Sequence, residues 1–323
     1  MFLKLILDKN LMATMKKDLF IACLVKLTIS SIASASEISS DFNLTEIAEK
    51  NYVHIGKHAS IEDEENDDIA NIGFIVGDTC VAVIDTGGSI NTGRKLKNSI
   101  RKITKKPICY VINTHIHYDH ILGNKSFADE NPDFVGHKNL QDAINQNKKF
   151  FLSQFKKNLS KDANESDIIS PNILIKKSTK LELGNRILTL IPFSTSHSHN
   201  DIVVIDEKTK TLWAGDLIFR ERIPSLTGSL KGWLKTIEKL KILDTKLVIP
   251  GHGKVASSLE VALKQQEEYF KILLNKTREA IAEGKFINEA VEHIDKENKL
   301  KWLLHDYQHS TNVSKTYTEL EWE

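Results

Sequence analysis

Cysteine is scarce in this sequence, and neither sign of charge dominates it. The 323 residues include 3 Cys, and 44 Lys and Arg are balanced by 43 Asp and Glu, for a formal net charge of +1. Three cysteines in a chain of this length exclude a small disulfide-stapled scaffold, and the balanced charge argues against a basic nucleic-acid-binding protein. The hydrophobic fraction of 41% argues against disorder. An ordinary globular protein remains, and its 12 histidines are on the high side.

Long apolar runs are few, and the clearest one lies near the N-terminus. Two lysines precede an apolar run over residues 19–32, and Ala33-Ser34-Ala35 has the small-x-small form of a cleavage site. The pattern predicts a secretory signal peptide over residues 1–35, cleaved after Ala35, and a periplasmic or secreted protein with no stable membrane insertion afterwards. The alternative is an uncleaved anchor, but the run is short for a membrane span and Lys26 interrupts it.

The two cysteines beyond this segment lie inside apolar, strand-like runs. Cys80 belongs to the run 79–84, and Cys109 belongs to the run 108–112. Free cysteines of this kind behave as small buried hydrophobes. We therefore expect them to be core residues and do not expect a disulfide between them.

Short apolar strands alternate with amphipathic helices along the rest of the chain, which predicts a mixed α/β fold. The predicted strands are 51–55, 71–76, 79–84, 108–113, 133–135, 186–191, 202–206, 211–214 and 247–249. The predicted helices are 91–103, 138–159, 230–243 and 259–282. The polar stretch 156–180 is interpreted as an exposed connection. Residues 36–258 would form the main domain, and residues 259–323 a C-terminal helical extension or a loosely ordered tail.

The segment Thr114-His115-Ile116-His117-Tyr118-Asp119-His120 directly follows an apolar strand and concentrates metal-binding side chains. In an extended segment, positions i and i+2 project to the same side, so His115 and His117 can bind one metal ion. A turn into a helix would point Asp119 and His120 toward a second ion. Imidazole and carboxylate donors without thiolate suit zinc, and also iron or manganese.

Three further segments place ligand-type residues just after apolar strands. They are Ser196-His197-Ser198-His199, Gly215-Asp216-Leu217 and Pro250-Gly251-His252-Gly253. Loops at strand ends are where a rigid scaffold brings functional groups together. We therefore expect these residues to meet the first motif in one site.

Together with Asn71-Ile72-Gly73-Phe74 and Val83-Ile84-Asp85-Thr86-Gly87, these segments resemble the metallo-β-lactamase superfamily over roughly residues 53–255. The resemblance implies a four-layer αβ/βα sandwich with two zinc ions per chain at one edge, between the sheets. It assigns the first zinc to His115, His117 and His197, and the second to Asp119, His120 and His252. Asp216 would bridge the two ions together with a water or hydroxide, and Asp85 would orient a ligand from beneath the site.

One ligand assignment within this resemblance is ambiguous. The family's His-Thr-x-Gly-Asp form favours His197 over His199, with Ser198 and Asn200 in the Thr and Gly places. His199 would then lie at the rim of the pocket or support a ligand, or be an exposed bystander.

The wording of residues 70–77, 81–89 and 109–115, and further on of 224–233, resembles one exported subgroup, the quinoprotein relay system zinc metallohydrolases, which include the SoxH-like proteins. The predicted function is a periplasmic dinuclear zinc hydrolase that uses a metal-bridging hydroxide to cleave an ester, thioester or amide of a small molecule. Asp119 would orient the nucleophile and carry its proton. Asp216 stands where common zinc β-lactamases carry Cys, so antibiotic hydrolysis is not expected as the main role. The alternatives are an iron-dependent persulfide oxidoreductase of the same fold and a metal-binding accessory protein of a periplasmic sulfur or quinoprotein system.

The acidic run over residues 62–68 is interpreted as a solvated loop. By resemblance it would lie near the mouth of the pocket, where it would disfavour anionic substrates. The sequence indicates neither the natural substrate nor the oligomeric state.

Overall fold

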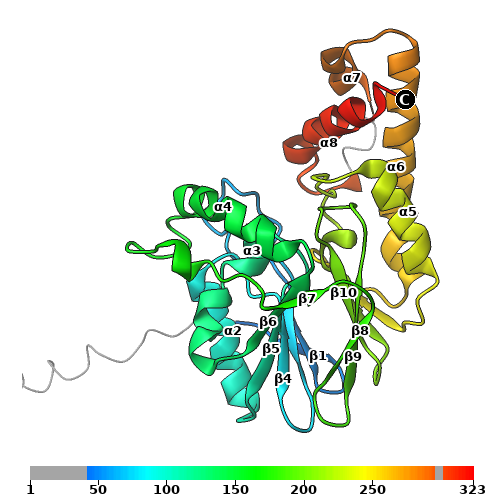
Figure 1. Ribbon diagram of the computed structural model, residues 1–323. Coiled ribbons are helices and arrows are strands. Elements are labelled where there is room, and N and C mark those ends of the chain that lie inside the picture. The colour runs from blue at the N-terminus through cyan, green and yellow to red at the C-terminus, as the bar shows by residue number, and fades with distance from the viewer. Residues whose placement is uncertain (1–41, 295–300) are drawn as a thin grey trace, which may run out of the picture. The chain divides into compact units, whose positions relative to one another are not determined.

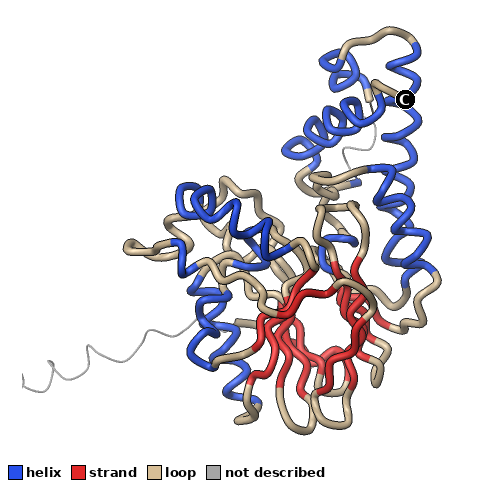
Figure 2. The backbone as a smooth tube through the Cα atoms, viewed as in Figure 1, coloured by secondary structure: helices blue, strands red, loops and turns tan. Residues whose placement is uncertain are grey.

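The computed structural model describes residues 42–294 and 301–323, so the predicted signal peptide lies outside the described residues. Two β-sheets face each other (Figures 1 and 2). The first sheet has the spatial order β1 (Thr45–Ala48), β2 (Asn51–His54), β3 (Ile72–Val76), β4 (Val81–Ile84), β5 (Ile108–Ile112), β6 (Asp133–His137), β7 (Ile173–Ile175). The second has the order β12 (Leu247–Ile249), β11 (Thr211–Trp213), β10 (Ile202–Asp206), β9 (Ile187–Pro192), β8 (Thr179–Glu182).

Helices lie on the outer side of each sheet, and the last two helices of the described part lie farther from the sheets (Figure 1). The α-helices of the described part are α2 (Ile90–Ile103), α3 (Tyr118–Ile121), α4 (Leu140–Gln154), α5 (Leu230–Lys241), α6 (Leu259–Ala282), α7 (Ile287–His293) and α8 (His305–Leu320). Short 3-10 helices that lie wholly within the described residues cover Asn124–Glu130, Glu165–Asp167 and Gly215–Leu217. None of the described helices is long and apolar enough to cross a membrane.

The alternating directions of the side chains along β4 show how the layers arise from the sequence. Ala82 and Ile84 point into a core shared with residues of the second sheet, whereas Val81 and Val83 pack with Leu96 of α2. Side chains of successive strand residues point to opposite faces, so an unbroken apolar run makes a strand that is buried on both sides. A corresponding cluster joins the outer face of the second sheet to α5, α6 and part of α8. The result is the expected four-layer αβ/βα arrangement with a C-terminal helical part.

Each of the predicted strands and helices is present, with ends that differ by a few residues. The prediction of an exposed connection over 156–180 was wrong in part, because β7 pairs with β6 and β8 begins at Thr179. Both strands are short and partly exposed, so they carry little alternation in the sequence. The C-terminal stretch is helical and packed, because α8 contacts both α6 and α7.

The prediction that the cysteines are not linked was also wrong: Cys80 and Cys109 form a disulfide. The strands β4 and β5 are parallel neighbours in which Val81 pairs with Ile108. This register brings the Cα atoms of the two cysteines to 5.8 Å, within the range that a disulfide spans. Cys80 is buried as expected, and the pairing depends on a strand register that the sequence does not reveal.

Candidate metal centre

Four strand ends supply the candidate site. The strands β4, β5 and β6 run parallel, as do β11 and β12, so their carboxyl ends meet at one edge of the sandwich. His115 and His117 follow β5, Asp216 follows β11, and His252 follows β12. The loop between β9 and β10 contributes His197.

The first cluster contains three imidazoles and one carboxylate. The Nε2 atom of His115 lies 2.9 Å from Nδ1 of His117 and 3.2 Å from Nε2 of His197. The other pair, His197 Nε2 and His117 Nδ1, is 2.8 Å apart. One carboxylate oxygen of Asp216, Oδ2, lies 3.6 Å from His115 Nε2 and 3.3 Å from His197 Nε2. His197 therefore joins the cluster, as the sequence favoured.

The second cluster contains Asp119, His120 and His252. Asp119 Oδ2 lies 3.5 Å from His120 Nε2 and 3.4 Å from His252 Nε2. The other oxygen of Asp216, Oδ1, is 3.1 Å from His120 Nε2 and 3.3 Å from His252 Nε2. The two oxygens of Asp216 thus face different clusters, which is the geometry of a bridging carboxylate.

These donors fit two divalent metal ions. Nitrogen and oxygen ligands about 2.0–2.2 Å from a tetrahedral zinc ion lie roughly 3.3–3.5 Å from one another, close to the separations seen here. His120 Nε2 and Asp216 Oδ1 are buried and lack a hydrogen-bond partner within the described structure. Buried polar atoms without partners are costly, and a bound cation would remove that cost for both. The whole donor set is imidazole and carboxylate, which suits zinc, iron or manganese.

The ring nitrogens that point away from the clusters are held by other groups. Thr114 Oγ1 lies 3.0 Å from His115 Nδ1, and the Ser225 and Ile69 carbonyls accept hydrogen bonds from Nδ1 of His197 and His252 at 2.7 and 2.8 Å. Such contacts fix the tautomer and the orientation of a metal-binding imidazole.

Asp85 lies beneath the site and contacts two of its residues. Its Oδ2 lies 2.7 Å from His120 Nδ1, and its two oxygens accept hydrogen bonds from the backbone N–H and the hydroxyl of Thr114, both at 2.8 Å. Its φ of 53° is in the left-handed region, which a non-glycine residue seldom adopts. Asp85 therefore orients one proposed ligand directly, and it anchors the residue that precedes His115.

The pKa shifts divide four of the clustered histidines into two kinds. Burial lowers the pKa of His115 and His117, and it lowers the pKa of His197 to about 3, so these rings keep free lone pairs. Burial also acts to lower the pKa of His120, but Asp216 and other nearby carboxylates outweigh it and raise that pKa well above its usual value. A metal ion would therefore have to displace a proton from His120 in order to bind it.

Helix α8 supports the site from outside, which the sequence did not predict. Asn312 is fully buried; its Nδ2 donates to the Pro224 carbonyl at 2.7 Å, and its Oδ1 accepts from the Leu226 backbone N–H at 3.0 Å. These two bonds bracket Ser225, whose carbonyl holds His197. Asn312 lies 86 residues beyond Leu226 and 88 residues beyond Pro224 in the chain, so no local pattern marks these two contacts.

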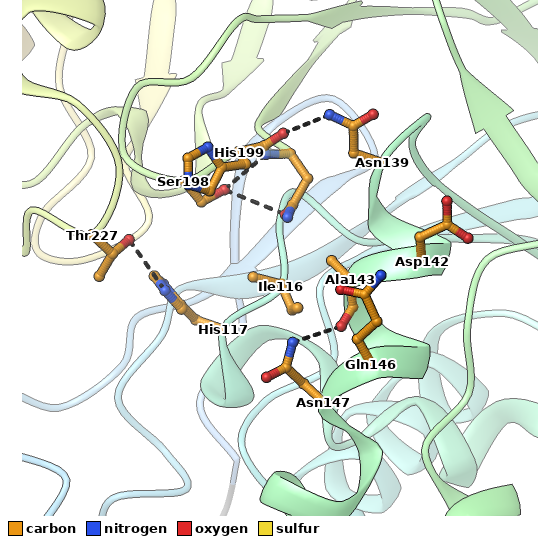
Figure 3. A pocket seen from close by; sticks show the side chains of 11 residues that line it. Ile116, His117, Asn139, Asp142, Ala143, Gln146, Asn147, Ser198, His199 and Thr227 are labelled. Carbon is orange, nitrogen blue, oxygen red and sulfur yellow. Dashed lines mark hydrogen bonds between the residues drawn. The ribbon is translucent and has the colours of Figure 1, made fainter.

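A cavity of about 480 Å³ opens beside His117 (Figure 3). His199 lines this cavity and lies outside both clusters, with its Nδ1 3.1 Å from Thr195 Oγ1. The acidic run does not line it. Glu62, Asp63, Glu64 and Asp67 instead line a separate cavity, which they share with Arg94 and with lysines that follow α4. The acidic run therefore does not border this cavity, and its effect on anionic substrates stays a prediction.

Comparisons with known proteins identify a family and two curated relatives. The family model described as the metallo-beta-lactamase superfamily matches residues 66–252. A probable metallo-hydrolase of Streptococcus pyogenes serotype M6 is 26% identical over 196 residues, which is 57% of this chain and 78% of that protein. A linear primary-alkylsulfatase of Pseudomonas sp. (strain ATCC 19151) is 46% identical over 48 residues, which is 15% of this chain and only 9% of that protein.

Solved structures share the fold at low sequence identity. A metallo-beta-lactamase from Pontibacter korlensis has a TM-score of 0.58 and 18% identity, covering 71% of this chain and 98% of that one. The sec-alkylsulfatase Pisa1 from Pseudomonas sp. has a TM-score of 0.62 and 20% identity, covering 86% of this chain. This chain matches 50% of the Pisa1 chain.

Proposed function

The chain belongs to the metallo-β-lactamase superfamily, and from that premise we propose that it is a dinuclear zinc hydrolase that cleaves an ester, thioester or amide of a small molecule. The observation that carries the proposal is the position of Asp216, whose two oxygens face the two clusters. An enzyme with a single iron ion would need only one of these clusters. The retention of both sets therefore favours the hydrolase over the persulfide oxidoreductase.

When bound, two zinc ions would lower the pKa of a water molecule to roughly 7 and stabilise the charge that develops on the substrate. The side chains of the site prepare this chemistry. Asp119 lies within 3.5 Å of His120 and His252, where its carboxylate can orient the attacking water and accept its proton. Asp85 and Ser225 hold His120 and His197 from behind, so the donors need little rearrangement.

We also propose that the protein works outside the cytoplasm. The predicted signal peptide and the Cys80–Cys109 disulfide support this location, because disulfides persist in oxidising compartments and are rare in the cytosol. The closeness to the SoxH-like subgroup remains a prediction from the sequence motifs.

Sulfate-ester hydrolysis is a second candidate. It is favoured by the 46% identity to the alkylsulfatase over 48 residues and by the greater coverage of this chain in the Pisa1 match than in the β-lactamase match. The match spans only 9% of the linear primary-alkylsulfatase and 50% of the Pisa1 chain, so we place carboxylic ester and amide cleavage first.

Metal analysis of the purified protein, with a hydrolysis screen over thioesters, esters, lactams and alkyl sulfates, tests the proposal. We expect about two zinc ions per chain and turnover in at least one acyl class. The variant Asp216→Ala should lose activity and metal, because it removes the bridge. One iron per chain with oxygen uptake on a persulfide, or full metal occupancy in Asp216→Ala, would overturn the assignment.

A further inference from the structure

The cavity beside His117 gives a candidate substrate site with a distinctive lining, and the inference drawn from it rests on the proposed hydrolase function. His117 belongs to the first cluster and also lines the cavity, so a substrate that reacts at the metal centre would extend into this space. Figure 3 shows α4 on one side of the cavity, facing His117, Thr227 and the loop that holds His199. Thr227 Oγ1 lies 3.4 Å from His117 Nε2 and forms the wall next to that ring.

Charge is almost absent from the lining. No lysine or arginine is among the described residues that surround the cavity, and Asp142 is the single carboxylate. An anionic group of a substrate would find no counter-ion there, and it would approach Asp142. The lining therefore disfavours sulfate, phosphate or carboxylate groups in the part of the substrate that lies beyond the reacting bond.

The lining of this cavity carries carboxamide side chains in place of charged ones. Four of the lining side chains are amides, namely Asn139, Gln146, Asn147 and Asn200. Asn139 and Asn147 use their NH₂ groups on the carbonyls of His199 and Ala143, at 3.1 and 2.8 Å, which leaves their side-chain oxygens as acceptors. Each amide offers both donors and acceptors. Such a set matches hydroxyl groups, which also donate and accept.

We propose that this cavity binds the uncharged, hydroxyl-bearing part of the substrate, so that the enzyme acts on esters of a polyol or sugar in preference to anionic esters. Gln146 is the residue best placed to recognise hydroxyl groups. It projects from the middle of α4, lines the cavity and is exposed, so its amide is accessible to a substrate. Asp142 adds repulsion against anions.

The test is a matched series of acyl esters whose alcohol part is glucose, glycerol, a hydroxycarboxylate of similar size, or choline. The hydroxycarboxylate gives the anionic ester of the series. With the zinc-loaded protein, we expect kcat/KM for the glucose and glyceryl esters to exceed that for the anionic ester at least tenfold. Gln146→Leu should lower this preference. Gln154→Leu is the matched control, because it makes the same change on an exposed position of the same helix outside the cavity.

A gain of function makes the test sharper. Asn147→Lys places a cation in the lining. It should change the ratio of kcat/KM for the neutral ester to kcat/KM for the anionic ester at least fivefold in favour of the anionic ester. Equal turnover of neutral and anionic esters, or an unchanged ratio in both Gln146→Leu and Asn147→Lys, would overturn the inference. A clear preference for the choline ester would overturn it in favour of a cation site at Asp142.

Equilibrium binding of the corresponding uncleavable ethers separates this inference from the proposed function. If no ester is cleaved but the neutral ether binds at least tenfold more tightly than the anionic one, the hydrolase proposal fails and the cavity assignment stands. If esters are cleaved without regard to charge, the hydrolase proposal stands and the cavity assignment fails. Equal binding of all the ethers also overturns it.

Discussion

Replacing Asn312 by leucine should loosen the first cluster, although Asn312 touches none of the proposed ligands. The side chain satisfies the Pro224 carbonyl and the Leu226 backbone N–H, and it also donates to the Tyr269 hydroxyl at 3.0 Å. Leucine has a similar volume but cannot make these bonds. A buried backbone group left without a partner costs about 1–3 kcal/mol, so two such groups cost about 2–6 kcal/mol if the segment stays in place.

Movement of the segment would relieve part of this cost at the expense of the site. Pro224 and Leu226 flank Ser225, so any shift moves the carbonyl that holds His197 Nδ1 at 2.7 Å. Loss of a partner that orients a metal-binding histidine typically lowers metal affinity about 10–100-fold. We expect Asn312→Leu to weaken one of the two zinc-binding steps by this amount and to leave the other nearly unchanged.

The assay is stepwise zinc removal by a competing chelator, with urea unfolding of the same samples. Tyr317→Phe is the control, because it removes another hydrogen bond of α8, the one to the Lys285 carbonyl at 2.9 Å, and leaves the contacts to Pro224 and Leu226 in place. If Asn312→Leu and Tyr317→Phe had the same two zinc affinities, the reasoning would be refuted even if Asn312→Leu were less stable. Should Asn312→Leu fail to fold, Asn312→Ser leaves space for a water and permits the same comparison.

Three further predictions concern other parts of the described structure. Asp85→Asn should lower zinc affinity about 10–100-fold with little change in secondary structure, as measured by chelator competition and circular dichroism; unchanged affinity would contradict the role given to this carboxylate. Arg186→Leu leaves the buried Asp206 without its ion-pair partner at 2.6 Å, and urea unfolding should show a loss of about 3–5 kcal/mol; a loss below about 1 kcal/mol would argue against the pair. Burial lowers the pKa of His137 to about 4. Since the unfolded chain takes up that proton near pH 6.5, stability should fall as the pH drops from about 6.5 to 4. Replacing His137 by Asn should reduce this dependence of the unfolding free energy on pH, as measured by urea unfolding. An unchanged pH dependence would contradict its assignment to His137.

The clustering of the proposed ligands could be predicted from the sequence because their positions have a local signature. His115 and His117 are two residues apart after a strong apolar strand, and Asp216 and His252 each follow an apolar strand beside a glycine. The carboxyl ends of parallel strands lie at the same edge of a sheet. Residues that directly follow such strands are therefore brought to one edge, largely independently of the lengths of the connecting loops. The structure brings all seven proposed ligands into two adjoining clusters.

The features that the sequence did not predict depend on contacts between distant segments. Asn312 is one polar residue in a polar helix, and its role appears only when α8 packs beside Leu226. The Cys80–Cys109 disulfide requires the register between β4 and β5. The pattern within each segment carries no information about either contact.

The disulfide has a consequence for how the chain withstands cleavage. Cys80 and Cys109 close a covalent ring that contains β4, the aspartate beneath the site, and all of α2. A protease that cuts once inside this ring would leave the two fragments joined, and the strand that leads into the histidine motif would stay tethered beside its neighbour. In the chain-entropy model, a ring with a sequence separation of 29 also makes the unfolded state less favourable by about 3–4 kcal/mol. The segment next to the proposed metals can therefore be nicked on its surface without being released.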